Sequence, residues 1–186
     1  AVIIAGATYS KKFVGFQGEF LALVLFSVSG MMLLVASQDV ITAYVALELS
    51  ALPAAALAAF LRTDRSLEAG LKFLLLSALS SAVLLYGLVY LYGATGTTDI
   101  AGMLEGINGM TADGDRAFGS SAVMLGVVTA VAGFGLKMAM ARFQMWVPDV
   151  YEGAPTPVVA FLSIASKLAA FPIVLRALYP ALGTEV

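Results

Sequence analysis

Five apolar runs, each near or above the length needed to cross a bilayer, constrain this chain more than any other feature of its sequence. They cover residues 17–36, 40–61, 67–92, 120–145 and 157–179. About 20 helical residues cross roughly 30 Å of hydrocarbon, and the runs lack the polar–apolar alternation of a transmembrane barrel. Hydrophobic residues make up 61% of the chain, against about 45–50% in soluble domains. We therefore predict an all-α integral membrane protein, with residues 1–186 forming a single bundle of five transmembrane helices.

The residue types that the chain lacks narrow its chemistry. It has neither cysteine nor histidine, which excludes disulfides, thiolate zinc sites, cysteine-held iron–sulfur clusters and haem on paired histidines within the chain. The net charge of −2 provides no basic stripe for nucleic acid. We therefore expect no metal, no cofactor, no catalytic centre and no nucleic-acid partner, and any redox chemistry must take place elsewhere.

Charges in the connecting segments predict the orientation. The positive-inside rule places four basic residues, and with them the N-terminal end, in the cytoplasm: Lys11, Lys12, Arg62 and Arg65. The acidic loop 93–119 is then outside, and the apolar spacing over 99–107 predicts a short surface helix there. No cleavable signal is evident at the first residue, Ala1. The absence of an initiator methionine fits either processing or a piece of a longer polypeptide.

Four charged residues lie inside these apolar runs: Glu48, Lys72, Lys137 and Lys167. One charge at the centre of a spanning helix costs roughly 2.5–3.5 kcal/mol, and such groups usually mark a path for ions or protons. Small neighbours on the same helix faces direct these side chains into the bundle rather than toward lipid. Burial favours a neutral amine and a nearby carboxylate favours the ammonium, so a lysine held between both influences can take and release a proton.

Each of these charges also has a purely structural explanation. Lys72 lies only about 8 Å beyond Leu67 along the helix, so its amine can snorkel to the interface. Lys137 can act as an interfacial anchor, and Glu48 and Lys167 can form a static polar site. We predict proton transfer through all four residues, with these alternatives left open.

The segment 146–157 contains three prolines and a glycine: Pro148, Gly153, Pro155 and Pro157. These residues predict that no helix continues through the segment. It is either a cytoplasmic loop between the fourth and fifth spans or a helix break within the membrane, where protein or water must satisfy the freed backbone groups. The sequence leaves both alternatives open.

The charged positions lie in motifs of a known family. The motifs are LELSALP at 47–53, AGLKFLLLSALSS at 69–81, GLK at 135–137, MWVPDVYEGAPTPV at 145–158 and ASK at 165–167. In order and spacing they resemble the antiporter-like membrane subunits of respiratory complex I, the NADH:quinone oxidoreductase. The resemblance covers nearly the whole chain, and the 145–158 motif is the most specific of the five.

The resemblance implies a function as well as a fold. It implies that Glu48 and Lys72 form a switchable pair that controls the central Lys137, and that Lys167 passes the proton along a hydrated axis. It further implies a multi-pass subunit of the bacterial inner membrane, in contact with lipid and with other membrane-arm subunits. The chain would move protons, and the redox reaction with quinone would take place elsewhere in the complex.

Length separates the chain from this family. A family member has some fourteen spans, including two inverted five-helix repeats, and this chain matches only the first repeat. We therefore expect a fragment, a split subunit or an engineered half. Two other functions stay open: a subunit of a multisubunit sodium/proton antiporter, and a structural membrane scaffold whose charges are locked in static pairs.

Overall fold

The computed structural model describes residues 15–112, 117–141 and 143–181, and these residues form seven helices. The helices are α2 (Gln17–Ala36), α3 (Val40–Ala58), α4 (Asp64–Thr95), α5 (Ile100–Ala112), α6 (Ala117–Lys137), α7 (Val147–Gly153) and α8 (Thr156–Ala181). The prediction of an all-α membrane protein is confirmed.

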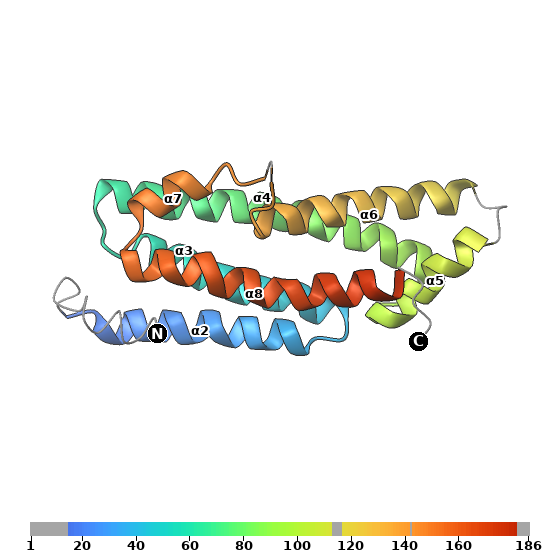
Figure 1. The fold of residues 1–186 in the computed structure, drawn as a ribbon, viewed down its shortest axis with the longest axis horizontal. Helices are drawn as coiled ribbons and strands as arrows, with labels where there is room; N and C mark the ends of the chain where they lie inside the picture. Colours follow the sequence, from blue (N-terminus) through green and yellow to red (C-terminus); the bar gives the residue numbers. More distant parts are fainter. Residues whose placement is uncertain (1–14, 113–116, 142, 182–186) are drawn as a thin grey trace.

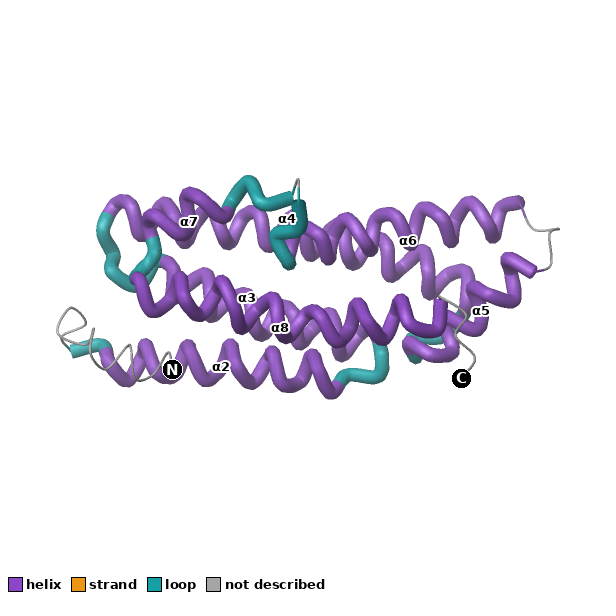
Figure 2. The backbone as a smooth tube through the Cα atoms, viewed as in Figure 1, coloured by secondary structure: helices purple, strands orange, loops and turns teal. Residues whose placement is uncertain are grey.

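The helices lie lengthwise in an elongated bundle (Figures 1 and 2). Helices α4, α6 and α7 form one side, α3 and α8 the middle, and α2 the other side. We call the end that carries α7 and the loop 59–63 the α7 end, and the opposite end, which carries the oblique α5, the α5 end. The closest helix pairs are α4 with α6 and α2 with α3.

Three helices of the described residues are long and apolar enough to cross a membrane: α2, α3 and α4. They coincide with the first three apolar runs of the sequence. Helices α6 and α8 follow the fourth and fifth runs, but their described apolar stretches are shorter. The total of five spans therefore stays a prediction, and Lys11 and Lys12 lie outside the described residues.

Glycines allow α4 and α6 to approach closely. A Cβ atom added to Gly87 would lie 2.5 Å from the Ala130 backbone nitrogen, and one added to Gly133 would lie 2.7 Å from the Leu84 Cα. Small residues are the usual means by which membrane helices bring their backbones together. The backbone of α6 is therefore fixed against α4 over most of its length.

The turns at the α5 end are capped and joined to one another. Asp39 accepts a 2.8 Å hydrogen bond from the Thr42 amide and so caps α3. The Val40 amide donates to the Thr98 carbonyl at 2.9 Å, which ties the α2–α3 turn to the α4–α5 turn. Within the predicted loop 93–119, α4 continues to Thr95, and α5 is longer than the short helix expected over 99–107.

The interruption in the fourth apolar run lies earlier than the sequence predicted. Helix α6 ends at Lys137, and the described residues of 138–146 are not helical. Ala139 adopts a left-handed φ of 52°, the Met140 amide donates to the Gly135 carbonyl at 2.9 Å, and the Ala139 amide donates to Leu136 at 3.3 Å. This is the Schellman arrangement that ends helices, usually with glycine at the left-handed position.

No single helix runs through the proline-rich segment 146–157, as predicted, but most of the segment forms a short helix that the sequence did not predict. Pro148 lies in the first turn of α7 and Pro157 in the first turn of α8. Proline is tolerated there because a first-turn amide has no acceptor within the helix. Gly153 is the last residue of α7, and only Ala154 and Pro155 separate it from α8.

Candidate functional site

A buried ion pair joins α3 to the end of α6. Lys137 Nζ donates to Glu48 Oε1 at 2.8 Å, and the two side chains are 7% and 26% exposed. The Ser81 hydroxyl of α4 donates to the same carboxylate oxygen. Three helices therefore meet at one carboxylate, which accepts one bond from an ammonium and one from a hydroxyl.

The helix break positions Lys137 for this contact. Lys137 is the last residue of α6, where the negative end of the helix dipole favours a cation. The Trp146 indole N–H donates to the Leu136 carbonyl at 3.2 Å and satisfies one of the groups freed at the helix end. The Ser80 hydroxyl fixes α6 to α4 through a 2.8 Å bond to the Gly133 carbonyl.

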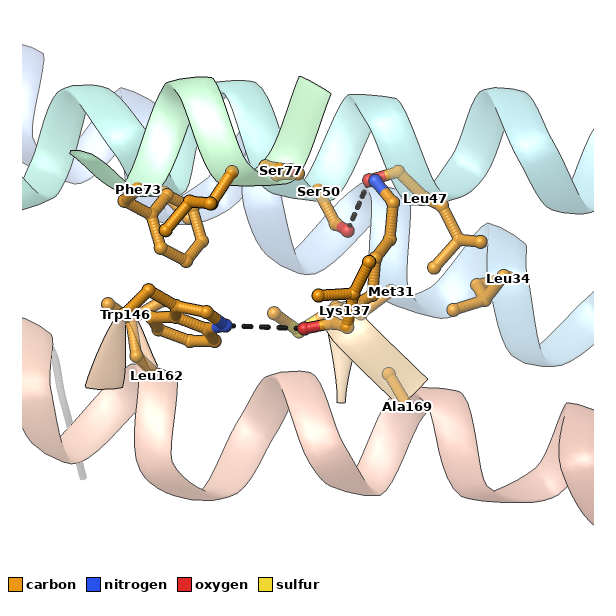
Figure 3. A pocket seen from close by; sticks show the side chains of 14 residues that line it. Met31, Leu34, Leu47, Ser50, Phe73, Ser77, Lys137, Trp146, Leu162 and Ala169 are labelled. Carbon is orange, nitrogen blue, oxygen red and sulfur yellow. Dashed lines mark hydrogen bonds between the residues drawn. The ribbon is translucent and has the colours of Figure 1, made fainter. Parts of the chain in front are cut away.

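A cavity of about 60 Å³, partly open to the surface, lies beside this pair. A buried water needs roughly 10–15 Å³ of such space and polar partners. Lys137, Ser50 and Ser77 line the cavity together with apolar side chains, so it can hold water. Figure 3 shows the Lys137 side chain extending across this pocket toward Leu47 and Ser50.

Lys72 lies in a separate, charged cleft between α4 and α7. Its Nζ is 2.7 Å from Glu68 Oε1 and 2.7 Å from Asp149 Oδ2. Arg65 and Glu152 form a longer contact of 3.6 Å in the same cleft, which has a volume of about 130 Å³. The Lys72 side chain is 40% exposed, so these pairs differ in kind from the buried pair.

The structure does not form the Glu48–Lys72 pair that the family resemblance implied. Glu48 bonds Lys137, and Lys72 bonds Glu68 and Asp149. Ser81 of α4 lies at the height of Glu48, because the two side chains are hydrogen-bonded. Lys72 precedes Ser81 by nine residues, and at 1.5 Å per residue it lies about 13 Å away along the helix axis. The structure therefore shows Glu48 paired with Lys137, and a switch of Glu48 to Lys72 stays a prediction.

Three contact residues were missed by the sequence analysis: Glu68, Ser81 and Asp149. Glu68 precedes Lys72 by four residues on α4, a spacing that brings opposite charges together on a helix and that was visible in the sequence. Asp149 lies inside the 145–158 motif but 77 residues from Lys72. Ser81 likewise reaches Glu48 across 33 residues, so neither contact had a local signal.

Lys167 lies on α8 and is half-buried. Within the described part of the chain it makes neither an ion pair nor a hydrogen bond. Leu162 and Ala169 of the same helix line the cavity beside Lys137. The structure therefore brings α8 to the cavity, and transfer from Lys137 to Lys167 stays a prediction.

A bundle of apolar helices with one helix interrupted beside a buried ion pair is the architecture of membrane transport proteins. The model of one family, described as NADH:quinone oxidoreductase/Mrp antiporter, TM, matches residues 37–184. The chain belongs to this family. The predicted resemblance to the antiporter-like membrane subunits of complex I is thereby confirmed.

Proteins with similar sequences share the name NADH-quinone oxidoreductase subunit N. NADH-quinone oxidoreductase subunit N of Dehalococcoides mccartyi is 42% identical over 178 residues, which cover 96% of this chain and 36% of the relative. Subunit N of Heliobacterium modesticaldum is 46% identical over 176 residues, or 94% of this chain and 35% of the relative. The chain thus spans about a third of the length of the relatives it matches.

Solved structures agree with these relatives. A chain of respiratory complex I from Thermus thermophilus, with bound aureothin, matches with a TM-score of 0.72 and 40% identity, over 85% of this chain and 34% of that one. The membrane-bound sulfane sulfur reductase, an archaeal respiratory membrane complex, matches with a TM-score of 0.73 and 27% identity, over 84% of this chain and 31% of that one.

Proposed function

We propose that the chain is a proton-translocating membrane module of a bacterial NADH:quinone oxidoreductase. Its relatives carry that name, and its buried charges lie where a membrane helix is interrupted. It contributes buried Glu and Lys residues, and the redox reaction takes place in other subunits. Its partners are then the other membrane-arm subunits, the lipid bilayer and protons.

The observation that carries this proposal is the Glu48–Lys137 pair at the end of α6. While the pair is closed, the carboxylate stabilises the protonated amine. If the two side chains separate, a 7% exposed ammonium loses its counter-charge, and burial then favours release of the proton. The adjacent cavity can hold the water that accepts it.

Ser81 supports this role because it offers the carboxylate a hydrogen bond that does not come from Lys137. Its hydroxyl bonds Glu48 from α4, independently of Lys137. Glu48 therefore keeps one hydrogen bond when the ion pair opens, and opening does not leave the carboxylate unpartnered. Lys72 and Lys167 are proposed to lie before and after the pair on the proton route.

The orientation proposal places the α7 end in the cytoplasm of an inner-membrane protein. Arg62 and Arg65 lie at this end, and the Arg62 guanidinium stacks 4.6 Å above the Phe16 ring, just before α2. The start of α2 and the α3–α4 turn therefore share one side, as the positive-inside rule requires for these basic residues. The N-terminal end would then be cytoplasmic.

A second candidate is a subunit of a sodium/proton antiporter, because the family description covers antiporters as well as the oxidoreductase. Vesicles that contain the intact complex distinguish the two. A sodium gradient imposed without NADH should drive proton movement only if the chain serves an antiporter.

The test of the main proposal is Lys137→Ala in the intact complex, reconstituted in sealed proteoliposomes. We expect NADH-driven acidification to be lost while much of the NADH-to-quinone electron transfer remains. Leu125→Ala on the exposed face of the same helix serves as the matched control and should leave both rates unchanged. Unchanged acidification in the Lys137→Ala complex would contradict the proposal.

A further inference from the structure

The charged cleft and the cavity beside Lys137 follow one another along the same two segments. On α4, Ala69 and Lys72 line the cleft, and the next residues along the same face, Phe73 and Ser77, line the cavity. The segment before and within α7 repeats this order, because Trp146 lines the cavity and Asp149 lines the cleft. The two spaces are therefore arranged in series.

Two aromatic side chains lie at the junction. The Phe73 and Trp146 rings meet edge to face, with centroids 5.0 Å apart and an interplanar angle of 76°. The two residues are 9% and 7% exposed, and Val150, one turn further along α7, is fully buried. Figure 3 shows Phe73 and Trp146 at one side of the pocket and Lys137 at the other.

We infer that Phe73 and Trp146 form an aromatic barrier between the charged cleft and the cavity beside Lys137, and that protons pass from the cleft to Lys137 when this barrier opens. The inference rests on the proposed function. It adds the place where proton uptake, before Lys137 is reached, is controlled. A proton needs a continuous file of water or polar groups, and an apolar constriction excludes water until it widens.

The polar groups lie on both sides of the barrier but not within it. Lys72, Glu68 and Asp149 are exposed to solvent on the cleft side. Ser50, Ser77 and Lys137 line the cavity on the other side. Between them lie the two aromatic rings and the buried Val150, so apolar side chains separate the two sets of polar groups.

Trp146 also connects the barrier to the ion pair. Its indole N–H bonds the carbonyl of Leu136, the residue directly before Lys137. Displacement of the ring would break this bond, while the backbone bonds of Ala139 and Met140 still hold the last turn of α6. The barrier therefore contacts the turn that carries Lys137.

The test measures water access to the cavity without turnover. A Ser77→Cys substitution places a thiol in the cavity of a segment that has no cysteine of its own. The intact complex is exposed to Ag⁺ from the cytoplasmic face of inverted membrane vesicles. The vesicles are then dissolved in detergent and treated with an alkylating reagent. The share of the peptide with the introduced thiol that is not alkylated gives the fraction that had reacted with Ag⁺.

We expect slow reaction in the parent Ser77→Cys complex and a rise of about tenfold, the equivalent of about 1.4 kcal/mol, when Phe73→Ala or Trp146→Ala is added. Trp146→Phe retains a ring and should keep the reaction slow. Leu71→Ala, on the exposed face of α4, is the matched control and should change nothing. Because no NADH is supplied, this result is independent of whether the complex pumps.

Three outcomes would overturn the barrier. One is fast reaction of the thiol introduced by Ser77→Cys with the aromatic pair intact. Another is no acceleration in either alanine variant, both of which are tested so that poor assembly of one does not decide the outcome. The last is equal acceleration at the thiol introduced by Ser80→Cys. Ser80 is buried against Gly133 and does not line the cavity, so reaction there would report a general loosening of the bundle.

Discussion

Charged side chains in the middle of the bundle differ from those at its α7 end in how much water surrounds them. In the middle, Glu48 and Lys137 are largely buried and pair with each other, and Glu48 also accepts a hydrogen bond from Ser81. At the α7 end, Lys72 has two carboxylate partners but is 40% exposed. Exposed pairs contribute about 0–1 kcal/mol, whereas removal of one member of a buried pair costs about 3–5 kcal/mol.

Because of this difference, opening has different consequences for the two kinds of ion pair. A buried pair that opens leaves two charges without their counter-charges, because bulk solvent does not replace them. An exposed pair that opens is compensated by water, and its main effect is to hold α7 against α4. The close approach of Gly153 to the Arg65 carbonyl, where an added Cβ would lie at 2.5 Å, strengthens that hold.

The largest expected effect contrasts two glutamates. Glu48→Ala leaves the Lys137 ammonium buried without its partner, so we expect a loss of about 3–5 kcal/mol in stability. Glu68→Ala removes one partner of Lys72 at the exposed end, where water replaces the lost charge and a much smaller loss is expected. Thermal melting of the intact complex, followed on this subunit, measures both.

Equal shifts in melting temperature for the two variants would remove the distinction between middle and end. Glu48→Gln refines the experiment because it retains an acceptor for Ser81 and Lys137 while it removes the charge. Its effect should lie between those of Glu48→Ala and the unmodified complex.

A smaller effect is expected at the α5 end, at the cap of α3. Hydrogen bonds from the Thr42 side chain and backbone hold the pKa of Asp39 below its ordinary value of 3.8. Asp39→Ala should therefore cost about 1 kcal/mol at neutral pH. Because the pKa is depressed in the folded state, this contribution is present above the ordinary value and is lost as the pH falls through the folded value.

Asp39→Asn is the matched variant, because an asparagine caps without titrating. The Asp39→Ala difference in melting temperature should be constant from neutral pH down to about pH 5 and shrink only in stronger acid. A difference that already disappears near neutral pH would show that another group is responsible.

The helices themselves could be predicted because long apolar runs have few alternatives in a membrane. The ends of those runs were less informative. Gly153 and Pro155 mark the short break between α7 and α8, while Pro148 and Pro157 occupy first turns. The earlier break, at the end of α6, occurs at Ala139, a residue that gives no warning of a left-handed conformation. Helix termination here depends on backbone hydrogen bonds that composition does not reveal.

The candidate site was predicted in its residues but not in its pairing. Glu48 and Lys137 were both predicted as site residues, because a charge inside a membrane-spanning helix has a high free-energy cost. They are 89 residues apart, however, and come together only through packing of the helices. Counts of depth along straight helices put Glu48 and Lys72 at different heights, which agrees with the pairs seen in the structure. The family resemblance favoured the other arrangement.

The central claim is that Glu48 is coupled to Lys137 and not to Lys72. The most direct measurement is a pair of double-mutant cycles on the melting of the intact complex, one with Glu48→Ala and Lys137→Met and one with Glu48→Ala and Lys72→Met. We predict a coupling of about 1–3 kcal/mol in the first cycle and additivity within about 0.5 kcal/mol in the second. Coupling in the second cycle with additivity in the first would contradict the account.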